Sequence, residues 1–225
     1  MTFNGPEGLL PLVGFNADGT LREHELELWR PRYKDPSHPA LIVGHHRDGR
    51  VIRPMMGGAE KLYSTQNSTR ITTAAAVAQP TGTAIRTMLQ IASGATIGQM
   101  TVVEWGVSYN GSAAAAGIPT EFFNCTGAAT MSTALAATDV VKWNTTEASS
   151  IQYSTALSGF ATAAVTEGTV ANAFLFDLQH IQPTNQYVKQ WPLGREPVGA
   201  VATFFRVRTT SAATVNAYIY LVWSE

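Results

Sequence analysis

Alternation of apolar and other residues with a period of two is the feature that most restricts the fold of this chain. It is clearest in MTVVEWGVSYNG, residues 100–111, where Val103, Trp105, Val107 and Tyr109 would share one face of a strand. Similar runs lie at residues 84–92, 118–125, 139–143, 160–168, 174–180, 200–210 and 215–225. The one candidate for a helix is ATMSTALAAT, residues 129–138. Strands at this spacing predict an all-β fold, a jelly-roll-like two-sheet β-sandwich.

The last of these runs, VNAYIYLVWSE, is apolar on both of its faces. Val215, Ala217, Ile219, Leu221 and Trp223 would line one face, and the other face also carries tyrosine and valine. A strand with two apolar faces is typically covered on both sides. We therefore expect residues 215–225 to form a central strand with Trp223 buried.

Charged residues divide the chain into two regions. Residues 1–70 hold 9 Lys and Arg and 8 Asp and Glu, whereas residues 71–225 hold only 6 and 8. Within the first region, EHELELW (23–29) alternates like a half-buried strand, and LIVGHHRDGRVIRP (41–54) predicts two short strands around an Asp48-Gly49 turn. The sequence predicts an extended, charged N-terminal arm with a small hairpin over residues 1–70, and a β-sandwich domain over residues 71–225.

Composition excludes several classes of partner. The formal net charge of the chain is −1, so we expect neither nucleic acid nor an anionic membrane surface among its partners. No apolar run approaches the roughly 18 residues of a membrane-spanning helix. Cys125 is the single cysteine, which leaves no intrachain disulfide and no cysteine-based zinc site within one chain.

No set of residues forms a convincing catalytic, metal or cofactor site. Cys125 ends an apolar run, where a cysteine is commonly a small buried hydrophobe. Glu104 and Glu121 both fall in expected strands and could serve as the carboxylate pair of a glycosidase only if they faced each other. His45 and His46 are adjacent, so on a strand they would point to opposite faces. We expect a protein that is not an enzyme and holds no metal and no cofactor.

The stretch QYVKQWPLGREPVG, residues 186–199, is longer than most connections between strands. We interpret it as a structured loop at a subunit contact, with Trp191, Arg195 and Glu196 as interface residues, because aromatic and arginine side chains are common anchors of interfaces. In the arm, Trp29 and Tyr33 are further interface candidates. The alternative is a loop that only covers its own sandwich.

Three motifs carry a resemblance to a known group of proteins: VVEWGVSYNGSAAA, QYVKQWPLGRE and NAYIYLVWSE. Together they make roughly residues 80–225 similar to virion proteins of tailed bacteriophages, of the capsid decoration or minor structural type. The resemblance implies a structural protein of the particle with a β-sandwich, and it implies no catalytic residues. It does not by itself distinguish the head of the particle from the tail.

We therefore expect a phage virion structural protein, first of all a capsid decoration (cement) protein that binds and stabilises the outside of the head. Its expected partners are other copies of itself, as a trimer, and the major capsid protein, with assembly in the host cytoplasm. A second possibility is a tail or baseplate component, or a receptor-binding jelly roll. A third is a carbohydrate-binding or carbohydrate-active protein that uses Trp105, Trp143 or Trp191 as a sugar platform.

Overall fold

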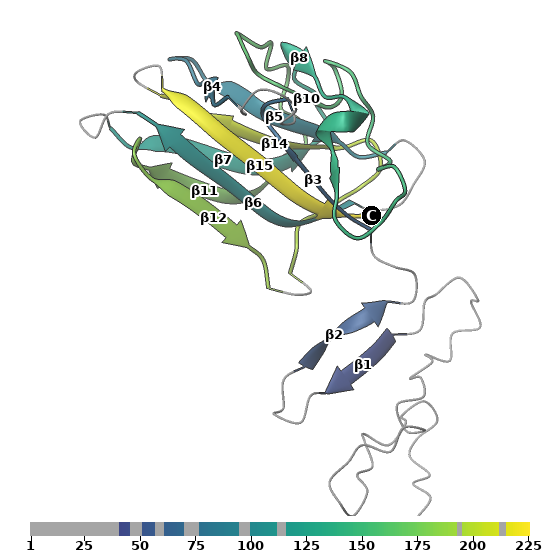
Figure 1. Ribbon diagram of the computed structural model, residues 1–225. Coiled ribbons are helices and arrows are strands. Elements are labelled where there is room, and N and C mark those ends of the chain that lie inside the picture. Colours follow the sequence, from purple (N-terminus) through teal and green to yellow (C-terminus); the bar gives the residue numbers. More distant parts are fainter. Residues whose placement is uncertain are drawn as a thin grey trace, which may run out of the picture. The chain divides into compact units, whose positions relative to one another are not determined.

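The computed structural model describes residues 41–45, 51–56, 61–69, 77–94, 100–111, 116–192, 195–211 and 215–225 (Figure 1). The chain divides into two units, Met1–Glu60 and Lys61–Glu225. In the first unit, β1 (Leu41–His45) and β2 (Val51–Met56) pair antiparallel, with a register shift between Ile42 and Gly44. This confirms the two strands predicted in residues 41–54, whereas residues 1–40 of the expected arm, including residues 23–29, lie outside the described residues.

The second unit is a β-sandwich of two antiparallel sheets. The first, called sheet I, has the order β11 (Phe174–Ile181), β7 (Ile118–Cys125), β14 (Phe204–Thr209), β5 (Arg86–Ala92), β10 (Gly159–Phe160) and β8 (Thr133–Ala134). The second, sheet II, has the order β12 (Gln186–Gln190), β6 (Met100–Asn110), β15 (Asn216–Ser224), β3 (Leu62–Gln66) and β9 (Val141–Lys142). In addition, β13 (Val198–Gly199) pairs with β6, and β4 (Gln79–Pro80) pairs with β15.

The sandwich unit begins at Lys61, before the division that the sequence placed at residue 70. Strand β3 pairs with β15 over five residues, and its Tyr63 is fully buried against Trp223 at a ring distance of 5.9 Å. The boundary had been placed by charge, and charged residues flank this strand without interrupting it. Alternation in LYSTQ is the better guide, since it matches the observed burial of every second residue.

Strand β15 confirms the expected central strand, since it lies between β6 and β3. Its five predicted inward residues are all buried, and Ile219, Leu221 and Trp223 are completely so. Asn67 reinforces the pairing with β3, because its side-chain amide donates to the carbonyl of Ala217 at 2.9 Å and accepts the amide of Ile219 at 2.8 Å. Most other predicted strands are also confirmed, including β7 with the predicted bounds.

Strand β6 contains a bulge that changes which residues face the core. Its register against β15 shifts where Val222 faces Glu104 and Trp223 faces Val102. As a result Met100 and Val102 are buried before the shift and Trp105 after it, while Val103 is only half-buried. The expected inward face is therefore correct from Trp105 to Tyr109 but wrong for Val103, because the extra residue of a bulge breaks the period of two.

Residues 126–173 depart most from expectation. Residues 129–138 form no α-helix but the short strand β8 and a 3-10 helix at Ala137–Asp139, because amides such as that of Met131 donate to carbonyls of residues 155–166. The strand expected at 160–168 is reduced to β10, since the amides of Thr162 and Ala163 donate to the hydroxyl of Ser132. The strand expected at 139–143 is reduced to β9.

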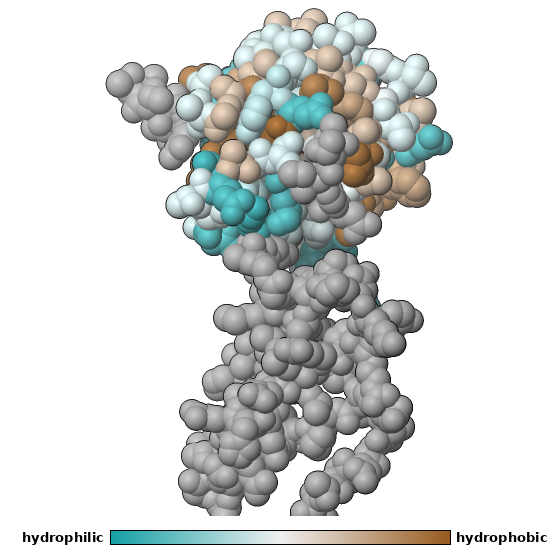
Figure 2. Space-filling model, turned by 90° about the vertical axis from the view of Figure 1, so that its right-hand side faces the viewer, coloured by the Kyte–Doolittle hydropathy of each residue, from teal (hydrophilic) through white to brown (hydrophobic). Residues whose placement is uncertain are grey.

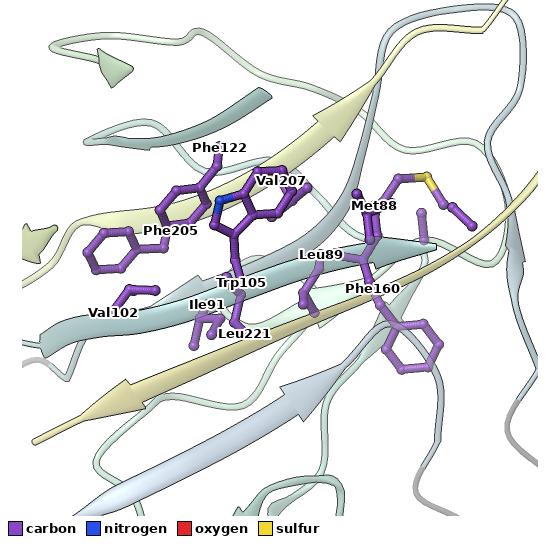
Figure 3. Packing of buried hydrophobic residues seen from close by; sticks show 14 of the residues in the cluster. Met88, Leu89, Ile91, Val102, Trp105, Phe122, Phe160, Phe205, Val207 and Leu221 are labelled. Carbon is purple, nitrogen blue, oxygen red and sulfur yellow. The ribbon is translucent and has the colours of Figure 1, made fainter. Parts of the chain in front are cut away.

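The core lies between the two sheets and is centred on stacked aromatic rings (Figure 3). Phe122 of sheet I lies 5.7 Å from Trp105 of sheet II and 5.8 Å from Phe205 of its own sheet. All three side chains are completely buried. A second, smaller cluster on the outer face of sheet I contains Phe123 and Cys125 and packs against Ala128 and Leu157, so residues 126–173 cover that face.

We predict that the chain without residues 1–60 keeps the sandwich fold, whereas the chain without residues 1–70 does not. The larger deletion removes β3 and Tyr63, and loss of one large core aromatic alone costs roughly 3 to 5 kcal/mol. Thermal unfolding followed by circular dichroism measures the difference. Equal melting temperatures for the two truncated chains would show that β3 contributes nothing to the sheet.

The two tryptophans Trp223 and Trp143 provide a matched test of the core. Trp223 is completely buried, and Trp143 is 63% exposed. We expect Trp223→Ala to lower the free energy of unfolding by roughly 3 to 5 kcal/mol. We expect Trp143→Ala to change it by about 0.5 kcal/mol or less. Urea unfolding of both variants gives the comparison, and similar losses in the two would contradict the placement of Trp223.

Candidate functional site

The stretch QYVKQWPLGREPVG is not the continuous loop that the sequence predicted. Residues 186–190 form β12, which pairs with β6, and β13 pairs with β6 again at residues 198–199. The chain leaves the sheet at Trp191 and rejoins it at Pro197, both beside the bulge of β6: the amide of Trp191 donates to Val103 at 3.2 Å, and the amide of Val102 donates to Pro197 at 2.9 Å. The alternation in QYVKQ indicates a strand, but the proline and glycine residues that follow it led to the prediction of a loop.

The proposed interface residues of this stretch differ in their surroundings. Trp191 is half-buried and packs on Phe122 of the core, with 5.5 Å between the ring centres. Arg195 is exposed and Glu196 is half-buried. Trp191 therefore covers its own sandwich, as the alternative interpretation holds, and an interface role of the three residues stays a prediction. Trp29 and Tyr33 lie outside the described residues.

A different candidate surface lies at the side of the sandwich where β11 is the edge strand of sheet I and β12 is the edge strand of sheet II. Figure 1 shows these two strands next to each other. The hydroxyl of Tyr187 in β12 donates to the carboxylate of Asp177 in β11 at 2.9 Å, and Gln179 donates to the other carboxylate oxygen at 2.7 Å. Burial, together with the hydrogen bond to Asp177, raises the pKa of Tyr187 to about 12, so the bond persists at neutral pH. We call this surface the open side.

Large apolar side chains are exposed on the open side. On β11, Phe174, Leu175 and Leu178 are 65%, 57% and 46% exposed, and Val188 of β12 and Val198 of β13 are 53% and 46% exposed. Large exposed apolar side chains on neighbouring edge strands are a common sign of a protein contact. On the far side of the sandwich, around β8 and β10, Figure 2 instead shows small patches of polar and apolar side chains interspersed.

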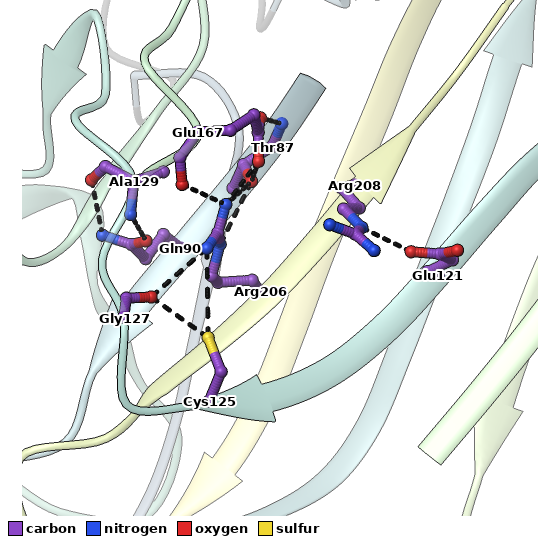
Figure 4. Close-up of polar contacts among 9 residues, drawn as sticks. All are labelled: Thr87, Gln90, Glu121, Cys125, Gly127, Ala129, Glu167, Arg206 and Arg208. Carbon is purple, nitrogen blue, oxygen red and sulfur yellow. Dashed lines mark hydrogen bonds and ion pairs between the residues drawn. The ribbon is translucent and has the colours of Figure 1, made fainter. Parts of the chain in front are cut away.

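The most deeply buried charge belongs to Arg206 of β14, whose side chain has no exposed surface (Figure 4). Its guanidinium forms an ion pair with Glu167, donates to the hydroxyl of Thr87 and donates to the carbonyl of Gly127 at 3.2 Å. Cys125 is also buried, with its sulfur 3.9 Å from Arg206. Because Gly127 and Glu167 come from the covering segment, residues 126–173, and Thr87 comes from sheet I, the cluster fastens that segment to the sheet.

Arg208 repeats the arrangement nearer the surface. Both arginines lie over the ring of Phe123, at 5.3 Å for Arg206 and 4.7 Å for Arg208, so they share one face of β14. Arg208 pairs with Glu121 of β7. Glu104 lies in sheet II and accepts from the hydroxyl of Tyr220 at 2.6 Å. Glu104 and Glu121 therefore belong to different sheets, are bonded to their own neighbours and do not form the carboxylate pair considered from the sequence.

The tryptophans considered as sugar platforms separate clearly. Trp105 is completely buried, which rules it out, and Trp191 packs on the core. Trp143 is exposed, and its ring nitrogen donates to the hydroxyl of Ser64 at 2.9 Å, so the ring is held beside the outer face of sheet II. Trp143 is the member of the three whose exposure would permit stacking on a ligand.

The described residues contain no group of three or more His, Cys, Asp or Glu that could hold a metal ion. In the same part of the chain, no helix has the length and apolarity needed to cross a membrane. The chain matches no protein-family model, and searches of curated proteins and of solved structures find nothing similar to it.

Arg206 and Arg208 allow the structural role of the buried cluster to be tested. Removing one partner of a buried ion pair leaves the other without its counter-charge, so we expect Arg206→Ala to cost about 3 kcal/mol in the free energy of unfolding. Arg208 is partly exposed, and we expect Arg208→Ala to cost about 1 kcal/mol or less. Urea unfolding measures both. An Arg206→Ala variant as stable as the Arg208→Ala variant would contradict the fastening role.

Proposed function

We propose that this protein is a structural component of a tailed-phage particle, a capsid decoration protein that binds the outside of the head. The open side carries the proposal. A free-standing sandwich with apolar side chains on two neighbouring sheet edges is prone to uncontrolled association, whereas a protein built into an assembly has neighbours to cover them. The sequence resemblance of residues 80–225 to virion proteins supports the same conclusion.

We further propose that the sandwich is a jelly roll. Among the described residues of the second unit, the sheet strands of five residues or more are, in chain order, β3, β5, β6, β7, β11, β12, β14 and β15. The first pairs with the last, β5 with β14, β6 with β12, and β7 with β11. Such nested pairing is that of one long antiparallel ribbon rolled into two sheets. Jelly rolls of this kind are frequent in viral capsid proteins and lectins.

The proposed activity is binding, not catalysis. The polar side chains around Arg206 find their hydrogen-bond partners within the fold, and so does Glu104. Both groups therefore support a structural role. A protein that binds only the assembled shell stabilises that shell by mass action. Its partners on this proposal are the major capsid protein and further copies of the chain, and its location is the virion, assembled in the host cytoplasm.

Two other functions belong to different classes. A tail or baseplate component would use the same sandwich with fewer copies in each particle. A carbohydrate-binding role is favoured by one observation, the exposed indole of Trp143, because sugars stack on exposed aromatic rings. Saturable binding of oligosaccharides to the purified wild-type chain, lost in Trp143→Ala, would favour that role over decoration.

Copy number in purified particles tests the decoration proposal. A decoration protein covers the whole lattice, so we expect hundreds of copies for each particle by quantitative mass spectrometry, and antibody labelling confined to heads in electron micrographs. The major capsid protein and a tail-tip protein in the same sample serve as the high and low references. A few copies for each particle, or labelling confined to tails, would overturn the proposal in favour of a tail component.

A further inference from the structure

The backbone of β11 has an unsatisfied edge. The carbonyl of Pro119 in β7 accepts from Thr210, so residue 119 directs its backbone groups toward β14 and away from β11. Because His180 faces Pro119 in the register, His180 and, two residues earlier, Leu178 direct their own amide and carbonyl groups away from β7. No strand of the described residues pairs with that edge.

Strand β12 has a matching free edge in the other sheet. The carbonyl of Asn185 accepts from β6 and the amide of Trp191 donates to β6. The register between them is regular, so the alternate residues Gln186, Val188 and Gln190 direct their backbone groups away from β6. Both sheets thus present free hydrogen-bonding groups on the open side, and Tyr187 with Asp177 holds the two edges together.

Strand β11 lacks two common protections of an edge strand, lysine and proline, although its register against β7 shifts between Leu175 and Asp177. It has eight residues, and its one carboxylate, Asp177, is held by Tyr187 and Gln179 of the same chain. Strand β12 is shorter and carries Lys189. On the opposite side the sheets end in β8 and β9, which have only two residues each. The open side is therefore built to be covered.

We propose that the open side is covered by the open side of a second copy of this chain, with strand edges pairing across the contact. Packed sheets lie about 10 Å apart, so a single peptide strand can satisfy one of the two edges but not both. A second copy presents two sheet edges with the same spacing. This inference rests on the proposed homo-oligomeric virion protein. Because both copies use the same surface, the contact joins them as a dimer, in place of the trimer expected from the sequence.

The charges of the open side permit such a contact. Besides Asp177, the two strands carry only His180 and the half-buried Lys189, so neither sign dominates the surface. Like charges placed against each other would oppose self-association, and no cluster of them occurs on β11 or β12. The exposed Phe174, Leu175 and Val188 would instead bury apolar surface against their counterparts.

The experiment compares two double variants of the full chain. Leu178→Lys with Val188→Lys places charges on both edges, at side chains that are 46% and 53% exposed. Ile85→Lys with Val77→Lys makes the same chemical change at side chains that are 43% and 65% exposed but lie off these strands. We expect light scattering to give a multiple of 24.1 kDa for the wild type and the control, and 24.1 kDa for the edge variant. A monomeric wild type, or an edge variant of unchanged mass, would overturn the inference.

Hydrogen exchange separates lost assembly from lost folding. The backbone amides at positions 178 and 180 should be protected in the wild type and exchange at least 100-fold faster in the edge variant. The amide of Gln179 points to β7 and should stay protected in both, which reports an intact sandwich. Fast exchange of Leu178 and His180 in the wild type would also overturn the inference. A wild-type chain that is monomeric yet decorates heads would rule out the proposed contact between copies and leave the proposed function unaffected.

Discussion

Phe122 is the ring on which the packing of the two sheets depends. It contacts Trp105 from sheet II, Phe205 and Phe176 from sheet I, and Trp191 from the segment that follows β12. Such contacts add directional preference to the burial of apolar area. The bulge at Val103 turns Trp105 toward this ring, and Trp191 and Pro197 bond to β6 at the same bulge. Core packing and the geometry of the open side are therefore coupled.

Polar groups inside the fold serve as fasteners between segments that are distant in sequence. Arg206 joins sheet I to the covering segment through Glu167, and the Asn67 amide joins β3 to β15. Each of these groups finds its partners within the chain, which is the condition for burying polar atoms without large cost. The side chains that remain available to bind a partner are therefore on the surface, chiefly on the apolar open side and at the exposed Trp143.

Strands with strict alternation or a long apolar run, such as residues 118–125 and 215–225, were predictable because side-chain direction follows the period of two. The wrong face for Val103 arose because a bulge depends on the neighbouring strand and leaves no local signal. The shortening of the strand expected at 160–168 has a similar cause: the hydroxyl of Ser132, thirty residues away, accepts the amide of Thr162. Long-range hydrogen bonds of this kind cannot be inferred from one short stretch.

The candidate site shows the same limit. Apolar residues on both faces indicate a covered strand, and for residues 215–225 that interpretation is correct, since β15 is central. Residues 174–181 have a similar pattern but form an edge strand with exposed Phe174 and Leu178. The pattern indicates that both faces of a strand pack against something. Whether its own sandwich or another molecule provides that packing depends on the topology. Gln186–Gln190 was missed because proline and glycine nearby dominated the local signal.

Pairing of β3 with β15 has a consequence for the order of folding during synthesis. Asn67 and Ala217 are 150 residues apart in the sequence yet joined by a hydrogen bond. Sheet II therefore lacks its central strand until nearly all of the sandwich has left the ribosome, and the partner edges of β3 and β6 wait unpaired. Contacts of such long sequence separation slow folding and prolong exposure of strand edges. A nascent chain of this protein should depend on chaperone protection more than one whose neighbouring strands pair as they emerge.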